Sequence, residues 1–379
     1  MRYLTPWIER DLRKKMVLLG GPRQSGKTTL AKHIAAGVPG SQYFNWDYEP
    51  DRLRVTRLDW DEDAALVVFD EIHKRPRWKT WLKGLYDVRY PIQRYLVTGS
   101  ARLDVYRKGG DSMLGRYHYW RLHPFSLSER PPRMSTAQAL QRLMTVGGFP
   151  EPFLDGNTAA AKRWRRDRHD RVIRDDIRDL ESVSSVAHLQ MLLDALRARV
   201  SSLVVQANLA TDLQVAPKTV KRWLELLEAM YLVFAIRPYA KNLPRSLQKP
   251  AKVYFFDNGD VIGDEGARFE NLVATHLLKE LQFLEDSTGD RWQLGYVRDK
   301  EKREVDFVTV CNGVVEELIE AKWADATPSP HLAYFAERLK PRRGCRQIVG
   351  QLPTKRAGRF GGIAVVPITD AFPPTLFSR

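Results

Sequence analysis

The sequence has two cysteines and no long apolar run. The first feature bears on the redox compartment of the protein and the second on whether it spans a membrane. Cys311 and Cys345 form no Cys-x-x-Cys pair, which favours a reduced, cytoplasmic protein. The eight histidines show no zinc-like spacing. A run of about 18 apolar residues, long enough to span a bilayer, does not occur, and residues 16–19 are too short for a signal peptide. We therefore expect no membrane association.

Positive charge is what the sequence has in excess. It holds 61 Lys and Arg against 46 Asp and Glu, a net charge of +15. Such an excess favours nucleic acid or another anionic partner without proving one. The chain is also too long for one ordinary domain. Composition shifts and Pro- or Gly-rich stretches predict four parts, at residues 1–130, 131–199, 200–258 and 259–379.

Short apolar runs in the first part alternate with helical stretches. The runs lie at residues 16–19, 66–69 and 95–97, and turn residues bound them. Such runs suit parallel strands that are covered on both faces. The prediction is an α/β, doubly wound parallel sheet that ends near Pro124. A helical region, a winged helix and a second α/β domain are expected to follow.

A phosphate-binding motif follows the first of these strands. Residues 21–28 read Gly-Pro-Arg-Gln-Ser-Gly-Lys-Thr, in which glycines let backbone N–H groups face phosphate oxygens at a helix N-terminus. Lys27 is expected to reach the β- and γ-phosphates of ATP and Thr28 to hold Mg²⁺. The residues predicted to hold the nucleotide are Gly21, Gln24, Ser25, Gly26, Lys27, Thr28 and Thr29. The alternative is a chance glycine-rich turn.

Polar residues also end the second and third strands. Asp70 and Glu71 follow the run at 66–69, so we expect Asp70 beside the metal and Glu71 as the general base for water. The third strand ends in Thr98 and Ser100, either of which could sense the γ-phosphate, because parallel strands present their carboxyl ends at one edge. The alternatives are two solvated acids and an ordinary polar turn.

These motifs, in this order, resemble a family of bacterial and archaeal AAA+-like ATPases whose C-terminal part is the domain DUF4143. The resemblance rests on the P-loop, on Phe-Asp-Glu-Ile-His at 69–73 and on Thr-Gly-Ser-Ala at 98–101. It continues at Gly-Gly-Phe-Pro-Glu, Arg-Asp-Asp-Ile and Lys-Val-Tyr-Phe-Phe-Asp, which begin at residues 147, 174 and 252. It implies an AAA+-type ATPase that works as a homo-oligomer, such as a hexameric ring.

The resemblance also implies an arginine supplied by a neighbouring subunit. Such a group stabilises charge on the transferring phosphoryl. Residues 112–116 match the family's small-residue loop before an arginine, so Arg116 is the first candidate and Arg102 the second. The alternative is an arginine that pairs with surface carboxylates.

The third part reads helix, turn, helix and then two strands with a basic connection. Lys218, Lys221 and Arg222 share one face of the second helix, and Lys241 and Arg245 lie between the strands. This order is typical of a winged helix, whose second helix can enter the major groove while the wing touches phosphate. These five residues are the predicted DNA contacts, although winged helices also bind proteins.

The densest basic run is Lys-Arg-Trp-Arg-Arg-Asp-Arg at residues 162–168. Its cations go nearly all round a helix, so it is not a clean groove-binding stripe. A solvated surface is the ordinary interpretation, and a contact with phosphates is the alternative.

The last part predicts a hairpin that carries acids and a lysine. Asp306 lies on its first strand, and Glu320 and Lys322 share a face of the second because strand side chains alternate. A strict two-residue turn at 312–313 would pair Asp306 with Ile319 and point Glu320 away. Asp306 joins that face only if the loop has an odd number of residues.

Glu270 lies on the apolar stripe of a predicted helix, where an unbound carboxylate is costly. The order Glu270, Asp306, Glu320, Lys322 resembles the PD-(D/E)xK nuclease fold. There, three carboxylates hold Mg²⁺ and the lysine assists water or the phosphate. The alternatives are a fold kept for binding alone and a buried salt-bridge cluster around Lys322.

Three functions follow from these observations. The first is a Mg²⁺-dependent ATPase that binds duplex, forked or junction DNA and uses hydrolysis to remodel it or to translocate. The second is an ATP-gated, metal-dependent nuclease. The third is an ATP-dependent switch that binds a protein partner through the winged helix.

Overall fold

The computed structural model describes residues 2–99, 113–177, 183–240, 249–352 and 357–377. They form two compact units. The first comprises residues 1–124 with the short segment 229–231, and the second comprises residues 125–228 and 232–379. The first unit therefore ends at Pro124, where the alternation of strands and helices was expected to end.

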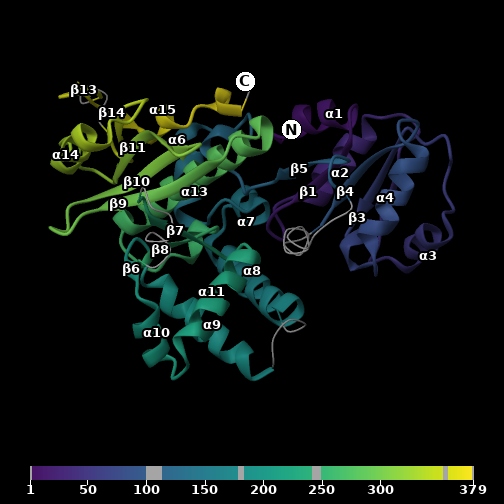
Figure 1. The fold of residues 1–379 in the computed structure, drawn as a ribbon, viewed down its shortest axis with the longest axis horizontal. Helices are drawn as coiled ribbons and strands as arrows, with labels where there is room; N and C mark the ends of the chain where they lie inside the picture. The colour runs from purple at the N-terminus through teal and green to yellow at the C-terminus, as the bar shows by residue number, and fades with distance from the viewer. Residues whose placement is uncertain (1, 100–112, 178–182, 241–248, 353–356, 378–379) are drawn as a thin grey trace. The chain divides into compact units, whose positions relative to one another are not determined.

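The first unit contains a five-stranded, entirely parallel sheet (Figure 1). Its strands are β1 (Met16–Gly20), β2 (Gln42–Asn45), β3 (Leu66–Asp70), β4 (Arg94–Thr98) and β5 (Tyr117–Arg121), in the order β2-β3-β4-β1-β5. Its helices are α1 (Thr5–Leu12), α2 (Lys27–Ala36), α3 (Glu49–Arg57), η1 (Ile72–Lys74) and α4 (Trp78–Arg89). The three predicted strands are β1, β3 and β4, which are adjacent.

Burial on both faces explains why these strands are continuous apolar runs. Every residue of β1 and β3 is buried. On one face, alternate residues such as Phe69 and Val97 pack with Leu82 and Leu85 of α4. Helices α1 and α2 contact the sheet as well. The covered sheet leaves its carboxyl edge, where β1, β3 and β4 end together, as the place for polar residues.

The second unit is larger and mixes helices with a broad sheet. Its helices are η2 (Leu127–Glu129), α6 (Thr136–Thr145), α7 (Pro150–Asp155), α8 (Thr158–Arg171), η3 (Val172–Ile177), α9 (Val183–Arg197), α10 (Gln206–Asp212), α11 (Pro217–Ala229), η4 (Asn258–Asp260), α13 (Glu265–Thr288), α14 (Pro330–Leu339), α15 (Ile368–Ala371) and η6 (Pro374–Phe377). Its strands are β6 (Leu203–Val204), β7 (Val233–Pro238), β8 (Ala251–Phe255), β9 (Trp292–Arg298), β10 (Glu304–Cys311), β11 (Val314–Lys322), β12 (Cys345–Val349), β13 (Gly358–Phe360) and β14 (Ile363–Pro367).

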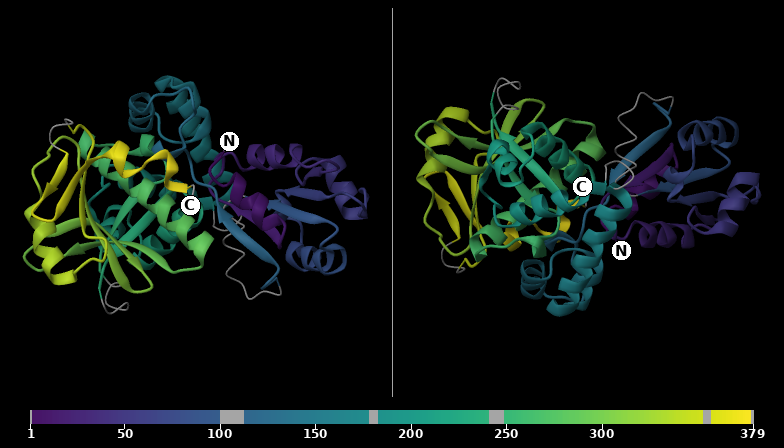
Figure 2. Two further views of the ribbon diagram at one scale, coloured as in Figure 1. Left: turned by 90° about the horizontal axis from the view of Figure 1, so that it is seen from above. Right: turned by 90° about the horizontal axis from the view of Figure 1, so that it is seen from below.

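These strands form one nine-stranded sheet in the order β13-β14-β12-β11-β10-β9-β7-β8-β6. Helix α13 packs on β8, β9 and β11 (Figure 2). The sequence analysis divided this region at residues 199 and 258, but β7 pairs in parallel with β9 across the second boundary. Residues from Phe125 onward accordingly form one compact unit rather than three.

Among the helices of the described residues, none is both long enough and apolar enough to cross a membrane.

Candidate functional site

The P-loop connects β1 to α2 at the carboxyl edge of the parallel sheet. Gly21 has a φ of +131°, and a Cβ there would lie 2.5 Å from the carbonyl oxygen of Leu122. Gly26 has a φ of +94° at the N-cap of α2. Both positions therefore require glycine. The first N–H groups of α2 have no partner inside the helix, so they face the position expected for phosphates.

The Lys27 ammonium folds back on this loop. It donates to the carbonyl oxygens of Gly21, at 3.0 Å, and Pro22, at 2.6 Å. Ser25 Oγ is buried and has no hydrogen-bond partner within the described residues. Arg2 holds the loop from outside, because its guanidinium donates to the Ser25 carbonyl oxygen at 2.6 Å. The loop is thus a pre-shaped cradle with unsatisfied donors.

Asp70 is the centre of a hydrogen-bonded set beside the loop. Its carboxylate accepts from the hydroxyls of Thr28, at 2.7 Å, of Tyr43, at 2.6 Å, and of Thr98. Strand β4 pairs with both β1 and β3, so Thr98 lies level with Leu19 and Asp70. Burial and the Asp70 contact raise the pKa of Tyr43. The strand ends therefore meet as the sequence predicted.

Oxygen atoms from Thr28 and Asp70 fit a magnesium ion that is bound together with a nucleotide. Such an ion takes one or two protein oxygens and completes its shell with phosphate oxygens and water. The Thr28 hydroxyl and the Asp70 carboxylate are already within 2.7 Å of each other. Among the described residues no group of three or more acidic, histidine or cysteine side chains is arranged to hold an ion, so phosphates would have to supply the remaining ligands.

Glu71 follows Asp70 in the left-handed region, with a φ of +58°. Its N–H donates to the Thr98 carbonyl oxygen at 3.0 Å, which fixes the backbone. Its carboxylate lies 3.4 Å from the Lys74 ammonium. Burial raises the pKa of Glu71, with Lys74 and Lys27 acting in the opposite direction. A raised pKa suits a carboxylate that accepts a proton from water.

Arg116 lies at the other edge of the same sheet. It directly precedes β5, and its carbonyl oxygen accepts from the N–H of Met16 at the start of β1. Its guanidinium forms a bidentate pair with Asp87, at 2.6 and 3.1 Å. From the amino edge of the sheet it is directed away from its own P-loop. Any role of Arg116 in hydrolysis would therefore require a neighbouring subunit.

Four predicted residues lie outside the described part of the chain. They are Ser100, Arg102, Lys241 and Arg245. Their roles stay predictions. The three predicted DNA contacts on α11 are described: Lys218, Lys221 and Arg222 are all exposed. The opposite face, with Val220, Leu224 and Leu227, is buried as the periodicity predicts.

The C-terminal hairpin brings Asp306 and Glu320 together by a route that the sequence did not reveal. The turn at 312–313 has two residues, since Cys311 pairs with Val314. A β-bulge at Thr309 and Val310 then shifts the register, so that Phe307 pairs with Ile319. Continuing that register places Asp306 opposite Glu320. The sequence analysis required a loop with an odd number of residues to bring these two acids to one face. The extra residue of the β-bulge has the same effect within the strand.

A lysine from another strand sits among the predicted metal ligands. Lys252 of β8 is 2% exposed, and its ammonium lies 3.2 Å from Glu270, 2.7 Å from Glu304 and 3.6 Å from Asp306. Burial alone would lower the pKa of Lys252, but these carboxylates raise it. The ammonium therefore stays charged and neutralises the acids. We call Lys252, Glu270, Glu304 and Asp306 the Lys252 cluster.

This arrangement does not fit the predicted magnesium site of Glu270, Asp306 and Glu320. The cluster is organised by an ammonium, and no group of three metal-ligating side chains is spaced for an ion in the described part of the chain. Glu320 pairs with Lys322 at 2.8 Å. A buried salt-bridge cluster was the alternative to a metal site, but its centre is Lys252 and not Lys322.

Burial raises the proton affinity of two acids, Glu270 and Glu320. Burial and the nearby charge of Asp306 raise the pKa of Glu270 to about 7, and they raise the pKa of Glu320 likewise to about 7. Glu320 Oε2 is buried without a hydrogen-bond partner among the described residues. The hydroxyl of Tyr254 donates to Glu270 at 2.7 Å. Glu270 and Glu320 are therefore stabilised by neighbouring side chains and by protonation, and neither needs a metal ion.

Sequence reasoning missed several residues of both sites. Tyr43 and Arg2 contact Asp70 and the P-loop, and Lys252, Tyr254 and Glu304 complete the second cluster. A signal existed for Lys252 and Tyr254. They alternate within the apolar run at 251–255, so they share one face of a buried strand, where polar groups need partners.

Three family models match successive parts of the chain. One is described as an AAA domain and matches residues 13–130. The chain thus contains a P-loop domain of the AAA type. A domain of unknown function, DUF8612, matches residues 137–261, and another, DUF4143, matches residues 265–371. The resemblance stated from the sequence motifs is thereby confirmed, and the nucleotide site described above lies within the AAA domain.

Relatives and solved structures of this AAA-type protein were also found. Uncharacterized proteins of Mycobacterium bovis and Mycobacterium tuberculosis are each 27% identical over 248 residues, which are 65% of this chain and 55% of theirs. The match thus spans about half the length of these relatives.

Among solved structures, a Walker-type ATPase of Pyrococcus abyssi has a TM-score of 0.41 and 13% identity and covers 67% of this chain and 92% of its own. Two RuvB variants of Thermotoga maritima have TM-scores of 0.31 and 0.32 with 15% and 17% identity, and they cover 61% of this chain and 88% of theirs.

Proposed function

We propose that this AAA-type protein hydrolyses ATP with Mg²⁺ and couples the hydrolysis to remodelling of, or translocation along, duplex, forked or junction DNA. The observation that carries the hydrolytic part is the contact of Thr28 with Asp70 beside the P-loop, with Glu71 next in the chain. Thr28 and Asp70 would hold the ion, which would supply charge neutralisation to the phosphates. Lys27 would bind the β- and γ-phosphates, and Glu71 would take a proton from the attacking water.

Glu71→Gln tests the assignment of the base. The variant is expected to bind ATP with nearly unchanged affinity and to lose about 10²- to 10⁴-fold in turnover, because an amide cannot accept the proton. Phosphate release in a single turnover, measured beside binding of ATP, separates the two effects. Glu49→Gln removes a carboxylate that is 75% exposed on α3 and serves as the control. Turnover of the Glu71 variant at the unaltered rate would assign the base to another group.

We further propose that the active form is a homo-oligomer in which Arg116 serves the P-loop of a neighbouring subunit. Arg116 lies at the amino edge of the sheet and the P-loop at the carboxyl edge, so the two sites of one subunit are separated by the length of the strands. In an oligomer, Arg116 would leave Asp87 and contact the phosphates of the adjacent subunit. A monomer with full turnover would contradict this.

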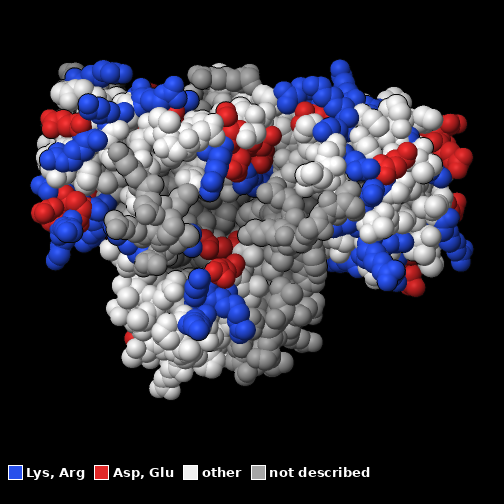
Figure 3. Space-filling model, viewed as in Figure 1, with Lys and Arg blue, Asp and Glu red and all other residues white. Residues whose placement is uncertain are grey.

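The DNA part of the proposal rests on α11 and its surroundings. Helix α9, strand β6, helices α10 and α11 and strands β7 and β8 follow one another, and β6, β8 and β7 are antiparallel neighbours. We interpret this order as a winged helix with α11 as its recognition helix. The exposed cations of α11 support the interpretation. Overall charge does not choose the interface, because basic and acidic side chains are interspersed on the face shown in Figure 3.

Removing the α11 cations together tests this surface. Lys218→Ala/Lys221→Ala/Arg222→Ala is expected to weaken duplex binding and to lower the slope of log affinity against log salt by about 2 to 3, at roughly 0.9 per lost phosphate contact. Anisotropy titrations at several salt concentrations give both quantities.

The control removes three exposed cations elsewhere, Arg133→Ala/Lys300→Ala/Arg359→Ala. Equal losses in the two triple variants would mean that net charge, and not α11, determines binding. A protein that binds no DNA but captures a stoichiometric protein partner through α11 would favour the regulatory switch.

The nuclease function is not proposed. It requires a metal held by Glu270, Asp306 and Glu320, and the Lys252 ammonium neutralises the first two of these acids.

A further inference from the structure

A cavity of about 500 Å³ opens within the second unit, far along the chain from the P-loop motif. Its walls come from α8, η3, α9, the segment 259–262 and the first turns of α13. Most of these residues belong to the part that matches DUF8612, for which no function is known. Cavities of 300 to 1,000 Å³ are the usual size for small-molecule sites. We call this cavity the α8–α9 pocket.

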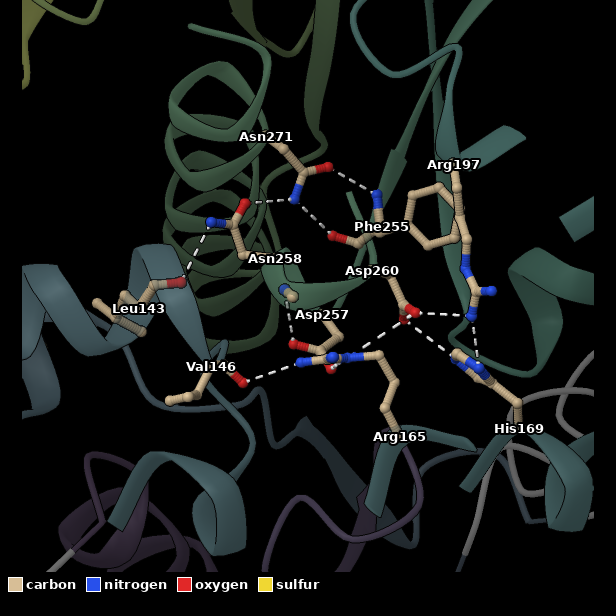
Figure 4. Close-up of polar contacts among 11 residues, drawn as sticks. Leu143, Val146, Arg165, His169, Arg197, Phe255, Asp257, Asn258, Asp260 and Asn271 are labelled. Atoms are coloured by element: carbon tan, nitrogen blue, oxygen red, sulfur yellow. Dashed lines mark hydrogen bonds and ion pairs between the residues drawn. The ribbon is translucent and has the colours of Figure 1, made fainter. Parts of the chain in front are cut away.

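The floor of the α8–α9 pocket is a closed polar network (Figure 4). Asp260 accepts from His169 Nε2, at 3.1 Å, and from Arg197, at 2.9 Å. Arg197 also contacts His169 Nδ1 at 2.7 Å. Because a guanidinium can only donate, His169 Nδ1 must accept and Nε2 must carry the proton. The ring is therefore fixed in its orientation, and Arg197 is held at the pocket surface.

A second anchor fixes Arg165 beside this network. Its Nε donates to Asp257 at 2.8 Å and Nη2 donates to the Val146 carbonyl oxygen at 3.3 Å. Gly259 makes room for it, since a Cβ there would collide with the guanidinium. Burial alone would raise the pKa of Asp260, but the hydrogen bond from His169 and the charges of Arg197 and Arg165 lower it to about 2. Asp260 thus stays ionised, and the contacts of Asp257 and Asp260 orient the two arginines without needing a ligand.

The rim of the pocket carries cations that the network does not neutralise. The lining holds five Lys and Arg against three Asp. Asp260 is bonded within the floor and Asp194 pairs with Arg197 at 2.7 Å, so Asp170 is the lining acid that no ion pair engages among the described residues. Lys162 and Arg268 make no side-chain ion pair within the described residues, and Arg166 has an exposed neighbour, Asp167, at 3.7 Å. An unfilled positive rim over a rigid floor favours an anion.

One wall of the pocket is apolar. Ile173 and Val261 are buried there, and Ile262 is 62% exposed. A simple phosphate ion would leave the exposed Ile262 side chain of this wall in contact with water. A ligand with a phosphate at one end and a flat or apolar group at the other would cover both features.

We propose that the α8–α9 pocket binds a nucleotide unit, with its phosphate on Lys162, Arg166 and Arg268 and its base against Ile262. The unit can be a free nucleotide or the terminal nucleotide of a strand, since both offer a phosphate monoester next to a base. This site is separate from the P-loop and does not depend on ATP hydrolysis.

Calorimetric titration on a Lys27→Ala background tests the proposal, because that substitution removes the P-loop lysine. The probes are AMP, inorganic pyrophosphate, and a short single strand with either a 5′ phosphate or a 5′ hydroxyl. Adding Lys162→Ala/Arg268→Ala is expected to weaken binding of the preferred probe about tenfold or more, since two charge-assisted contacts are lost. Arg163→Ala/Arg171→Ala removes the same charge from exposed positions of α8 outside the lining and should change affinity about twofold at most.

The probes separate the two sources of the nucleotide. Pocket-dependent binding of AMP supports a free nucleotide, whereas pocket-dependent preference for the 5′-phosphorylated strand over the 5′-hydroxyl strand supports a strand end. Equal weakening by the two double substitutions, or no binding of any probe, overturns the proposal. Pyrophosphate binding as tight as AMP binding would also overturn the assignment of the apolar wall. Thermal unfolding of each variant checks that the exposed substitutions leave the fold intact.

Discussion

Lys27→Ala is expected to reduce ATP turnover by about 10²- to 10³-fold or more, the usual loss when a positioned group that stabilises transition-state charge is removed. The Lys27 ammonium donates to the carbonyl oxygens of Gly21 and Pro22. Phosphate oxygens would replace these neutral acceptors with charged ones, so the gain on binding is lost in the variant. Steady-state phosphate release measures turnover, and fluorescence of a labelled nucleotide measures affinity.

The loop itself should survive this substitution. Gly21 and Gly26 set its backbone, and Arg2 ties Ser25 from outside. A control, Lys14→Ala, removes an exposed lysine near the amino end of β1 and should leave turnover unchanged. If Lys27→Ala hydrolysed ATP at the unaltered rate, the nucleotide would not be using this loop.

The nucleotide site was predictable because its residues follow simple local rules. A buried strand, a glycine turn and a helix start place Lys27 and Thr28, and parallel pairing alone brings Asp70 and Thr98 to the same edge. Each rule needs only residues that are close in sequence, or the common direction of parallel strands. Tyr43 escaped prediction because β2 is only four residues long and is partly exposed.

The Lys252 cluster was only half predictable, for two physical reasons. The bulge at Thr309 and Val310 alters which side chains share a face, and nothing in that apolar run marks its position. Lys252 reaches the cluster because β7, its hairpin partner, pairs with β9 in the same sheet. That pairing joins segments whose sequences suggested separate domains, so no local pattern could have placed the lysine among these acids.

Lys252→Met should be the most destabilising single substitution of this region. It keeps much of the side chain's volume but leaves the carboxylates of Glu270, Glu304 and Asp306 without their common counter-charge. Breaking a buried ion pair by removing one partner costs about 3–5 kcal/mol. Urea unfolding followed by circular dichroism would measure the loss, with exposed Lys300→Met as the control. A change below about 1 kcal/mol would mean that the acids are neutral or solvated already.

The double variant Lys252→Met/Glu270→Gln separates the effect of the Lys252–Glu270 charge pair from the effect of packing around the lysine side chain. Replacing Glu270 with Gln removes one of the carboxylates that has lost its counter-charge. The amide oxygen of Gln can still accept the hydrogen bond from Tyr254. The double variant is therefore expected to be more stable than Lys252→Met alone, with a coupling energy of about 1–3 kcal/mol in the double-mutant cycle. Additive losses would instead point to packing around the lysine stem.

The pH dependence of Lys252→Met gives the sign of this effect. The pKa of Glu270 is already raised to about 7 with Lys252 present, and loss of the lysine raises it further. A raised pKa of an acid means that its stabilising contribution is full below the unfolded-state pKa and is lost as pH rises through the folded-state pKa. The stability gap between the Lys252→Met variant and the unaltered protein should therefore be small near pH 5, where Glu270 is protonated, and widen towards pH 8. A gap that narrows as pH rises would show that Lys252 does not neutralise these acids.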